Sequence, residues 1–145
     1  GQTEGTLYVE VDWRLTTGAT QSFLSANDGT GDNRLLIYNN SSSVDLTMFV
    51  QADGGSVEVN QGVDSSGFSG IQKIAFAYAN GDQELYLNGS SVSTATGSLA
   101  ALATLTDIDI GQGAGAGAQV NMWIRAVALY PKRLSDAEAE ALTTL

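Results

Sequence analysis

The chain of 145 residues contains no cysteine and no histidine. Without a thiol or an imidazole it has no disulfide, no cysteine nucleophile, no zinc site of the usual nitrogen and sulfur type, and no Ser-His or Cys-His catalytic pair. No apolar run approaches the roughly 18 residues of a membrane span, so we expect no membrane insertion. The remaining candidates are a binding module, a structural domain, and a hydrolase that works with carboxylates alone.

Positive charge is also scarce, with 6 Lys and Arg against 16 Asp and Glu and a net charge of −10. A nucleic-acid binder needs a basic face that displaces counterions, and six cations are too few for one. Nucleic acid and anionic membrane surfaces are therefore poor partners, and the acidity favours solubility. The composition, 43% hydrophobic and 15% charged, fits one folded domain over residues 1–145, which we interpret as a piece excised from a longer protein.

Short apolar runs separated by turn residues predict an all-β fold. The first run, Leu7–Leu15, alternates apolar and polar side chains, as a strand with one buried face does. The run Ile71–Ala79 is apolar on both faces and should lie in the centre of a sheet. Hairpin turns are predicted at Asp53-Gly54-Gly55, Asn80-Gly81-Asp82 and Asn88-Gly89. The ten predicted strands are Leu7–Leu15, Ser22–Ala26, Arg34–Asn39, Leu46–Ala52, Val57–Val59, Ile71–Ala79, Glu84–Leu87, Val92–Ala95, Ile108–Ile110 and Val120–Leu129.

The C-terminal segment predicts one short helix that lies against a sheet. Ser135 is an N-cap residue and Glu138 follows three positions later, which is the pattern of a reciprocal capping box. Asp136 and Glu138 place negative charge in the first turn, where the helix dipole favours it. Three leucines fall on one stripe of this helix: Leu134, Leu142 and Leu145.

Two glycine-containing stretches are interpreted as loops. Gly62–Gly70 is polar, with Phe68 as its anchor. Gly111–Ala118 alternates glycine with small residues, but it lacks the Gly-Lys-Ser/Thr ending of a phosphate-binding loop and does not open a helix. A flexible connection between strands is the expected role of this second stretch.

Several blocks, in their order along the chain, resemble the laminin-G-like, concanavalin-A-like jelly-roll superfamily. They are most similar to a version appended to tailed-phage and prophage virion proteins. The resemblance implies an antiparallel jelly-roll β-sandwich of two curved sheets, with the short C-terminal helix against an edge. It also implies a location on a virion surface or tail, extracellular when assembled, and relatives that often bind carbohydrate. The blocks are Glu4–Glu10, Ser25–Asn33, Lys73–Tyr78, Leu85–Gly89, Ile108–Gly111, Ile124–Arg125 and Tyr130–Glu138.

Enzyme activity is not expected. Glycoside hydrolysis needs two positioned carboxyl groups, and hydrolases of the resembled fold share a Glu-x-Asp-x-x-Glu strand motif. Glu10 and Asp12 begin such a motif, but its third position is Leu15. Asp107 and Asp109 also share one face of a strand, with no third acid after them.

The loop Asn27–Asn33 offers hard oxygen ligands of the kind that calcium takes, with Asp28 and Asp32 as the candidate metal ligands. The loop departs from an EF-hand because Tyr38 stands at the twelfth position, where an acid is needed. The alternative is an Asx-rich turn between two strands, and we favour that interpretation. Calcium is the only cofactor that the sequence brings into consideration.

A glycan site needs aromatic faces for the C–H surfaces of sugars and polar groups for their hydroxyls. Five candidates lie close together in the sequence, and Trp123 is a second aromatic platform. For the clustered group, a solvated loop without a ligand is an equally good interpretation, and the choice stays open. For Trp123, we favour packing in the core or at a sheet edge over a role in binding. The five clustered candidates are Asp28, Asp32, Asn33, Arg34 and Tyr38.

The sequence thus predicts a non-catalytic carbohydrate-binding or adhesion module of a phage or prophage virion protein, in a tail appendage or as capsid decoration. Its expected partner is a cell-surface glycan or other virion proteins. A homo-oligomer within the virion assembly is compatible with either partner. The competing hypothesis is a purely structural capsid or fibre domain that binds no glycan. A glycoside hydrolase is the weakest of the three.

Overall fold

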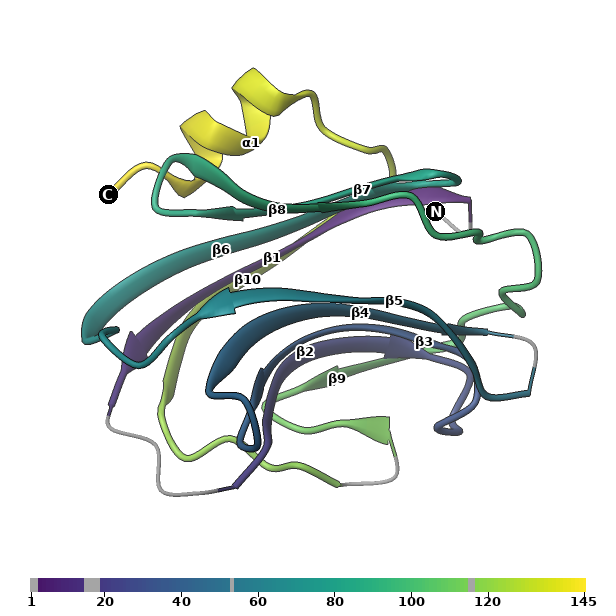
Figure 1. Ribbon diagram of the computed structural model, residues 1–145, viewed down its shortest axis with the longest axis horizontal. Coiled ribbons are helices and arrows are strands. Elements are labelled where there is room, and N and C mark those ends of the chain that lie inside the picture. Colours follow the sequence, from purple (N-terminus) through teal and green to yellow (C-terminus); the bar gives the residue numbers. More distant parts are fainter. Residues whose placement is uncertain (1–2, 15–18, 53, 115–116) are drawn as a thin grey trace.

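Two five-stranded antiparallel sheets lie face to face, and one short helix covers the outside of the upper sheet (Figure 1). The computed structural model describes residues 3–14, 19–52, 54–114 and 117–145. Sheet A has the strand order β10-β1-β6-β7-β8, and sheet B has the order β5-β4-β3-β2-β9. The elements are β1 (Glu4–Trp13), β2 (Gln21–Asn27), β3 (Arg34–Asn40), β4 (Asp45–Ala52), β5 (Ser56–Asp64), β6 (Gly70–Ala79), β7 (Asp82–Leu87), β8 (Ser90–Ala95), β9 (Asp107–Ile110), β10 (Trp123–Tyr130) and α1 (Asp136–Thr143).

The predicted all-β sandwich is confirmed, and each of the ten predicted runs forms a strand. Many strand boundaries differ by one to three residues, and the differences at β5 and β10 have identifiable causes. β5 extends to Asp64, because its backbone pairs along all of β4 although its side chains are mostly polar. β10 begins only at Trp123, because the amide groups of Val120 and Asn121 bond to Gly111 and to the Gln21 side chain instead of to a neighbouring strand.

Turn chemistry places the strands as the sequence predicts. Asn88 and Gly89 join β7 to β8 with φ angles of 51° and 86°, the mirror-image backbone that suits a two-residue hairpin. Gly81, between β6 and β7, also has positive φ. Two predicted features reach residues outside the described ranges, namely Leu15 at the end of the first run and Asp53 in the β4–β5 turn.

The main core fills the space between the sheets. Alternation in β1 buries Leu7, Val9 and Val11 there. At one end of this core Trp13 packs against Phe23 and Phe68, with ring centroids 5.3 Å away in each case. Phe68 therefore anchors its polar loop, as predicted.

β6 is the central strand of sheet A, which confirms the prediction from its two apolar faces. The residues on its inner face, including Ile74 and Phe76, are buried in the main core. Ala75 and Ala77 face outward into a second apolar cluster beneath α1. The helix packs on this outer face over β6, β7 and β8, and not against an edge as expected, because the small alanines leave room for it.

Helix α1 begins with the predicted capping box. The Ser135 hydroxyl accepts a bond from the Glu138 amide, and the Glu138 carboxylate accepts one from the Ser135 amide at 2.9 Å. The predicted leucine stripe is wrong at Leu145, which is 68% exposed. The helix ends at Thr143 and Thr144 is extended, so the helical period no longer applies to Leu145. Ala139 is buried on this face of the helix instead.

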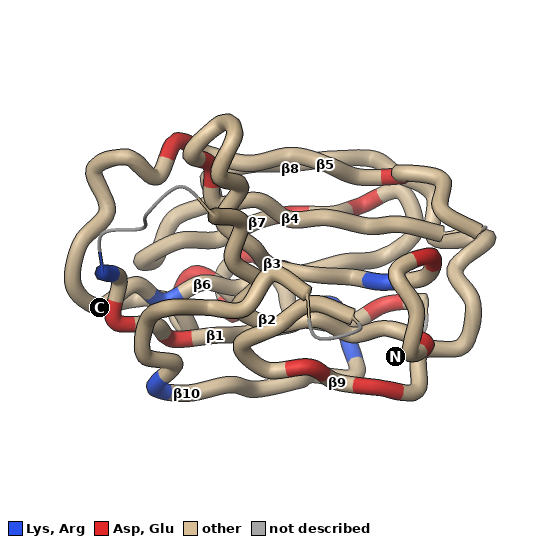
Figure 2. Tube along the Cα trace, turned by 90° about the horizontal axis from the view of Figure 1, so that it is seen from below, with Lys and Arg blue, Asp and Glu red and all other residues tan. Residues whose placement is uncertain are grey.

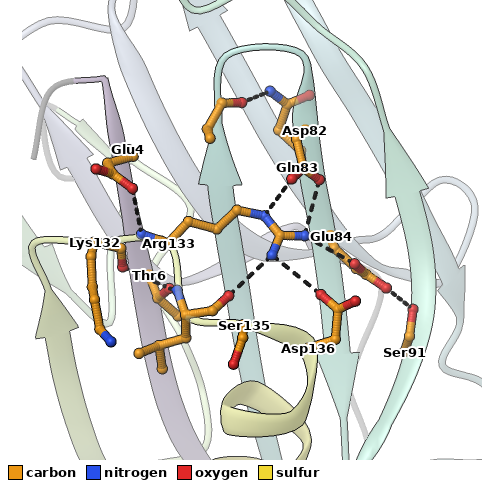
Figure 3. A network of polar contacts seen from close by, with 12 residues as sticks. Glu4, Thr6, Asp82, Gln83, Glu84, Ser91, Lys132, Arg133, Ser135 and Asp136 are labelled. Atoms are coloured by element: carbon orange, nitrogen blue, oxygen red, sulfur yellow. Dashed lines mark hydrogen bonds and ion pairs between the residues drawn. The ribbon is translucent and has the colours of Figure 1, made fainter.

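Arg133 ties the helix to sheet A (Figure 3). Its guanidinium contacts Asp82 at 2.9 Å and Glu84 at 3.1 Å, both on β7, and Asp136 at 3.2 Å in the first turn of α1. Nearby, the Thr6 hydroxyl accepts a bond from the Leu134 amide at 2.9 Å. These contacts hold the connection between β10 and α1 on the surface of the sheet.

The capping box makes the stability of the helix depend on pH. Bonds from the Ser135 amide and hydroxyl, with Lys132 nearby, lower the pKa of Glu138 from its usual 4.5 to about 2. A carboxylate with a lowered pKa contributes stability that is present above its ordinary pKa and is lost as the pH falls through its folded value. We expect Glu138→Gln, which keeps an acceptor but no charge, to melt below the wild type at about pH 7.

Melting curves followed by circular dichroism measure this difference. The gap in Tm between wild type and Glu138→Gln should close as the pH falls from 4.5 to 2. Ser135→Ala serves as the companion variant, because it removes the cap without removing the charge. A gap that stays constant across this pH range contradicts the assignment of the lowered pKa to the cap.

Candidate binding site

The outer face of sheet B carries a pocket of about 140 Å³. Strand alternation creates this face: Leu35 and Ile37 of β3 are fully buried in the core, so Arg34, Leu36 and Tyr38 point outward. No helix covers this side of the molecule (Figure 1), among the residues that the structure describes. The residues that line the pocket are Thr20, Ser22, Arg34, Leu36, Tyr38, Phe49, Gly113 and Ala118.

Phe49 of β4 is the aromatic centre of the pocket. The backbone register places it beside Leu36, and it is only 9% exposed. The Arg34 guanidinium carbon lies 5.2 Å from the centre of its ring. The Tyr38 ring meets it edge to face, with centroids 5.9 Å apart. Arg34 and Tyr38 are thus both held against one buried ring, which restricts their side-chain rotamers.

The orientation of Arg34 is fixed by a second contact. Its Nε donates to Oε1 of Gln51 at 3.0 Å, and the Gln51 amide group in turn donates to the Gly55 carbonyl at 2.8 Å. Burial lowers the pKa of Arg34, an effect opposed by Tyr38 and Asp32. An arginine stays charged at neutral pH in spite of such a shift, so the pocket contains a half-buried, oriented cation.

Two hydroxyl groups add polar character to the pocket. Tyr38 donates to Oδ1 of Asn60 at 3.2 Å, and burial raises its pKa, so the phenol is neutral at physiological pH. Ser22 is 1% exposed, and its Oγ finds no hydrogen-bond partner among the residues described. The pocket therefore combines an aromatic wall, a cation and an unsatisfied hydroxyl.

The loop after β9 forms one side of the pocket. The Ala118 carbonyl accepts a bond from the Ser22 amide at 2.7 Å, and the Gly113 amide bonds to the Gly117 carbonyl at 2.7 Å. The sequence indicated only a flexible connection here, and residues 115–116 of that stretch lie outside the described ranges. The described part instead contacts β2 and contributes Gly113 and Ala118 to the lining.

Arg34 and Tyr38 are brought together as the sequence suggested, but the other three clustered candidates lie outside the pocket lining, in or beside the turn between β2 and β3. Asp28 Oδ1 accepts bonds from the Thr30 amide at 2.9 Å and from its hydroxyl at 2.6 Å, and Oδ2 accepts one from Asn33 at 3.0 Å. These bonds, chiefly that from the Thr30 hydroxyl, lower the pKa of Asp28. The arrangement is the Asx-rich turn that we favoured.

Calcium binding by Asp28 and Asp32 stays a prediction. Asp32 is exposed, and its amide donates to the Thr30 hydroxyl at 3.1 Å. Within residues 3–14, 19–52, 54–114 and 117–145, no group of three or more acidic side chains could hold a metal ion. Backbone carbonyls would have to supply most of the six to eight oxygen ligands that calcium takes.

Trp123 differs from the expected core or edge packing. It belongs to β10 of sheet A, it does not line the pocket on sheet B, and 69% of its surface is exposed. The Arg14 guanidinium lies 4.8 Å from the ring centre and is paired with Asp12 at 2.5 Å. Trp123 pairs with Asp12 on the outer face of sheet A, opposite in orientation to the buried Val11, and it is exposed because α1 packs on this face over β6, β7 and β8 instead.

The carboxylates considered for hydrolysis do not form one site. Glu10 is paired with Arg125 at 2.7 Å and Asp12 with Arg14, both on sheet A. Asp107 and Asp109 lie on β9 of sheet B, which Figure 2 shows as an acidic strand. Asp109 accepts bonds from Asn27 and Gln112. Each of these pairs is engaged in local contacts, and Leu15, the third motif position, lies outside the described residues.

Six of the eight lining residues were missed by sequence reasoning, although a signal existed for Phe49. Phe49 alternates with Met48 and Val50 on β4, so a large apolar side chain was due on the outer face. An aromatic residue on a face without a covering layer indicates a binding surface. Ser22, Gly113 and Ala118 carry no comparable signal, because their role depends on contacts between distant segments.

The chain belongs to the concanavalin A-like lectin/glucanases superfamily, whose family model matches residues 2–140. This confirms the resemblance at the level of the superfamily. No curated protein matches the sequence.

Solved structures share the fold at low sequence identity. The leech intramolecular trans-sialidase, complexed with 2,7-anhydro-Neu5Ac, has a TM-score of 0.79 and 18% identity over 99% of this chain and 24% of its own. The CBM40 module of the Ruminococcus gnavus IT-sialidase, bound to α2,3-sialyllactose, has a TM-score of 0.73 and 21% identity, over 99% of this chain and 83% of the module's chain. The binding domain of botulinum neurotoxin DC, in complex with rat synaptotagmin II, has a TM-score of 0.74 and 15% sequence identity. The match covers 97% of this chain and 35% of the neurotoxin chain. This chain thus spans about a quarter of the leech enzyme and most of the CBM40 module.

The described residues contain no helix that is long and apolar enough to cross a membrane.

Proposed function

We propose that the protein is a non-catalytic carbohydrate-binding module and that its site is the pocket around Arg34, Tyr38 and Phe49. The observation that carries this proposal is the pocket itself, in which a half-buried cation and a phenol are held against one aromatic ring. Aromatic side chains with a few convergent polar groups are the usual composition of a small-molecule site. The fold is shared with a CBM40 module that binds sialyllactose, which supports the same function.

A binding role without catalysis is favoured by the state of the carboxylates. Among the residues that the structure describes, the pocket lining contains no Asp or Glu. Glycoside hydrolysis requires two carboxyl groups about 5–10 Å apart around one bond, and the acids on β1 are held in ion pairs on the other sheet. A ligand in this pocket would therefore be held and released unchanged.

Tyr38→Ala provides the test of this function. We expect the isolated domain to bind a subset of glycans on an array, and Tyr38→Ala to weaken that binding by about tenfold, because the sugar loses one aromatic contact. Trp123→Ala is the matched control, since it removes an exposed aromatic residue from sheet A. Arrays with and without calcium also test the metal prediction at Asp28 and Asp32.

Two outcomes count against the proposal. If no glycan binds, the carbohydrate function is wrong. If binding survives Tyr38→Ala but is lost in Trp123→Ala, the site lies on sheet A and the pocket is wrong.

A structural role in an assembly is the second candidate, favoured by apolar side chains on two edge strands. Ile108 and Ile110 of β9 are 45% and 52% exposed, and Leu129 of β10 is 48% exposed. Exposed apolar surface of this kind marks contact sites in many proteins. Concentration-dependent association in sedimentation velocity, together with an empty glycan array, would favour this role over carbohydrate binding.

We also propose that the domain works on a phage or prophage virion, as tail appendage or capsid decoration, with other virion proteins among its partners. This proposal rests on the sequence blocks described above. Labelling of purified particles with an antibody against the domain tests it, and unlabelled particles would contradict it.

A further inference from the structure

We infer that the pocket selects an acidic sugar and holds its carboxylate on the guanidinium of Arg34. This inference rests on the proposed carbohydrate function and adds the chemical class of the ligand. A carbohydrate module could equally take neutral sugars, and three features of the pocket decide against that.

The first feature is that Arg34 makes no ion pair among the described residues, although the Asp32 carboxylate acts on it at longer range. The protein has 16 acidic residues and 6 basic ones, so an arginine should find a carboxylate easily. Arg14, Arg125 and Arg133 each do so, at 2.5 Å, 2.7 Å and 2.9 Å. Arg34 is the one arginine without an ion pair in the described ranges. A half-buried cation without a contacting carboxylate is only partly compensated, and an anionic ligand would supply a charge in direct contact.

The second feature is the way the guanidinium is held. Its Nε is occupied by Gln51, and Phe49 lies against it. The two terminal nitrogens, Nη1 and Nη2, have no hydrogen-bond partner among the described residues. Parallel N–H groups of this kind match the two oxygens of a carboxylate. The side chain is thus prepared for a planar anion before any ligand arrives.

The third feature is the hydroxyl of Ser22, which is independent of Arg34 in sequence and in strand. It is buried, it has no partner in the described part of the chain, and it lines the same pocket. Buried polar atoms in native proteins are nearly always hydrogen-bonded. A ligand oxygen in the pocket would satisfy this group together with Arg34.

The size and charge of the surroundings restrict the ligand further. About 140 Å³ is small beside the roughly 300–1,000 Å³ of drug-sized sites, so the pocket suits one terminal sugar residue. The net charge of −10 repels polyanions at long range. A glycan with a single terminal carboxylate fits these limits better than a sulfated or phosphorylated polymer.

The test compares acidic sugars with neutral partners of the same shape by isothermal titration calorimetry. The probes are 3′-sialyllactose, its methyl ester, lactose, and a glucuronate-terminated disaccharide with its glucose counterpart. We expect at least one acidic sugar to bind about tenfold or more tightly than its uncharged partner. The two acidic probes distinguish a nine-carbon sugar acid from a uronic acid as the source of the carboxylate.

Variants then assign the preference to the pocket. Arg34→Met keeps an apolar stem over Phe49 and should abolish the preference for the acid, while Arg34→Lys should retain a part of it. Arg125→Met is the matched control, because this arginine is paired on sheet A, and it should leave binding unchanged. Ser22→Ala should weaken the acidic sugar severalfold without lowering Tm, since its hydroxyl has no partner to lose.

The outcomes separate this inference from the proposed function. Equal binding of acidic and neutral sugars, or a preference that survives Arg34→Met in a protein that melts like the wild type, overturns the inference and leaves carbohydrate binding intact. Should Arg34→Met fail to fold, Ser22→Ala and the methyl ester still decide the question. Absence of any glycan binding overturns the function itself.

Discussion

Trp13→Ala is expected to lower the free energy of unfolding by about 4 kcal/mol, as truncation of a large buried aromatic side chain does. Trp13 is 4% exposed and joins two other rings, Phe23 from sheet B and Phe68 from the polar loop, at 5.3 Å each. Its removal leaves a cavity at one end of the core and detaches the anchor of that loop. Urea denaturation followed by circular dichroism gives the size of the loss.

The protein supplies its own control for this experiment. Trp123 is the only other tryptophan, and it is 69% exposed. Trp123→Ala should cost no more than about 1 kcal/mol, the worth of an exposed cation–π contact with Arg14. The fluorescence of Trp123→Ala, which keeps only the buried Trp13, should be blue-shifted relative to that of Trp13→Ala. Acrylamide should also quench it less. Equal destabilisation in the two variants, or equal quenching, would contradict the assigned burial.

Arg133→Met is expected to cost about 3 kcal/mol, the lower end for the loss of one partner from a buried ion pair. The side chains of Arg133 and Glu84 are only 14% and 13% exposed. Without the guanidinium, the carboxylate of Glu84 stays mostly buried and has no cation. The two other acids that Arg133 contacts, Asp82 and Asp136, are 59% and 67% exposed, so water compensates them.

Lys132→Met is the matched control, because the adjacent Lys132 pairs with Glu138 where both side chains are at least half exposed. Exposed pairs contribute about 0–1 kcal/mol. Adding Glu84→Gln to Arg133→Met should recover part of the loss, since it removes the uncompensated charge. If Arg133→Met behaves like Lys132→Met, the network in Figure 3 holds the helix less firmly than its geometry indicates.

The stability of the helix and the proposed binding site are separate in space. Arg133 fastens α1 to the outside of sheet A, whereas Arg34 lies on the outside of sheet B. Substitutions at one should therefore leave the other unchanged, since distant sites without shared contacts act additively. The same protein thus uses two arginines differently: Arg133 forms ion pairs with three carboxylates, and Arg34 forms none among the described residues.

Local rules were sufficient for much of the molecule. A strand has a period of two, so the sequence of β3 already determines that Arg34 and Tyr38 share a face. Asn88 and Gly89 accept positive φ, and Ser135 caps a helix, whatever surrounds them. These features depend on the residue and its near neighbours, and for that reason the strands, the hairpins and the capping box were predicted correctly.

The tertiary structure alone decided which of these residues meet. Leu145 is exposed because the helix ends before it, and Trp123 is exposed on the outer face of sheet A because α1 packs over β6, β7 and β8 instead. Ser22, Arg34, Phe49 and Ala118 line one pocket because β2, β3, β4 and the loop after β9 come together in sheet B. Pairing between distant strands follows from burial of the whole core and not from local propensity. Sequence alone therefore determined the fold class and two members of the site, and the assembled sheets determined that an unpaired cation and an unsatisfied hydroxyl share a pocket.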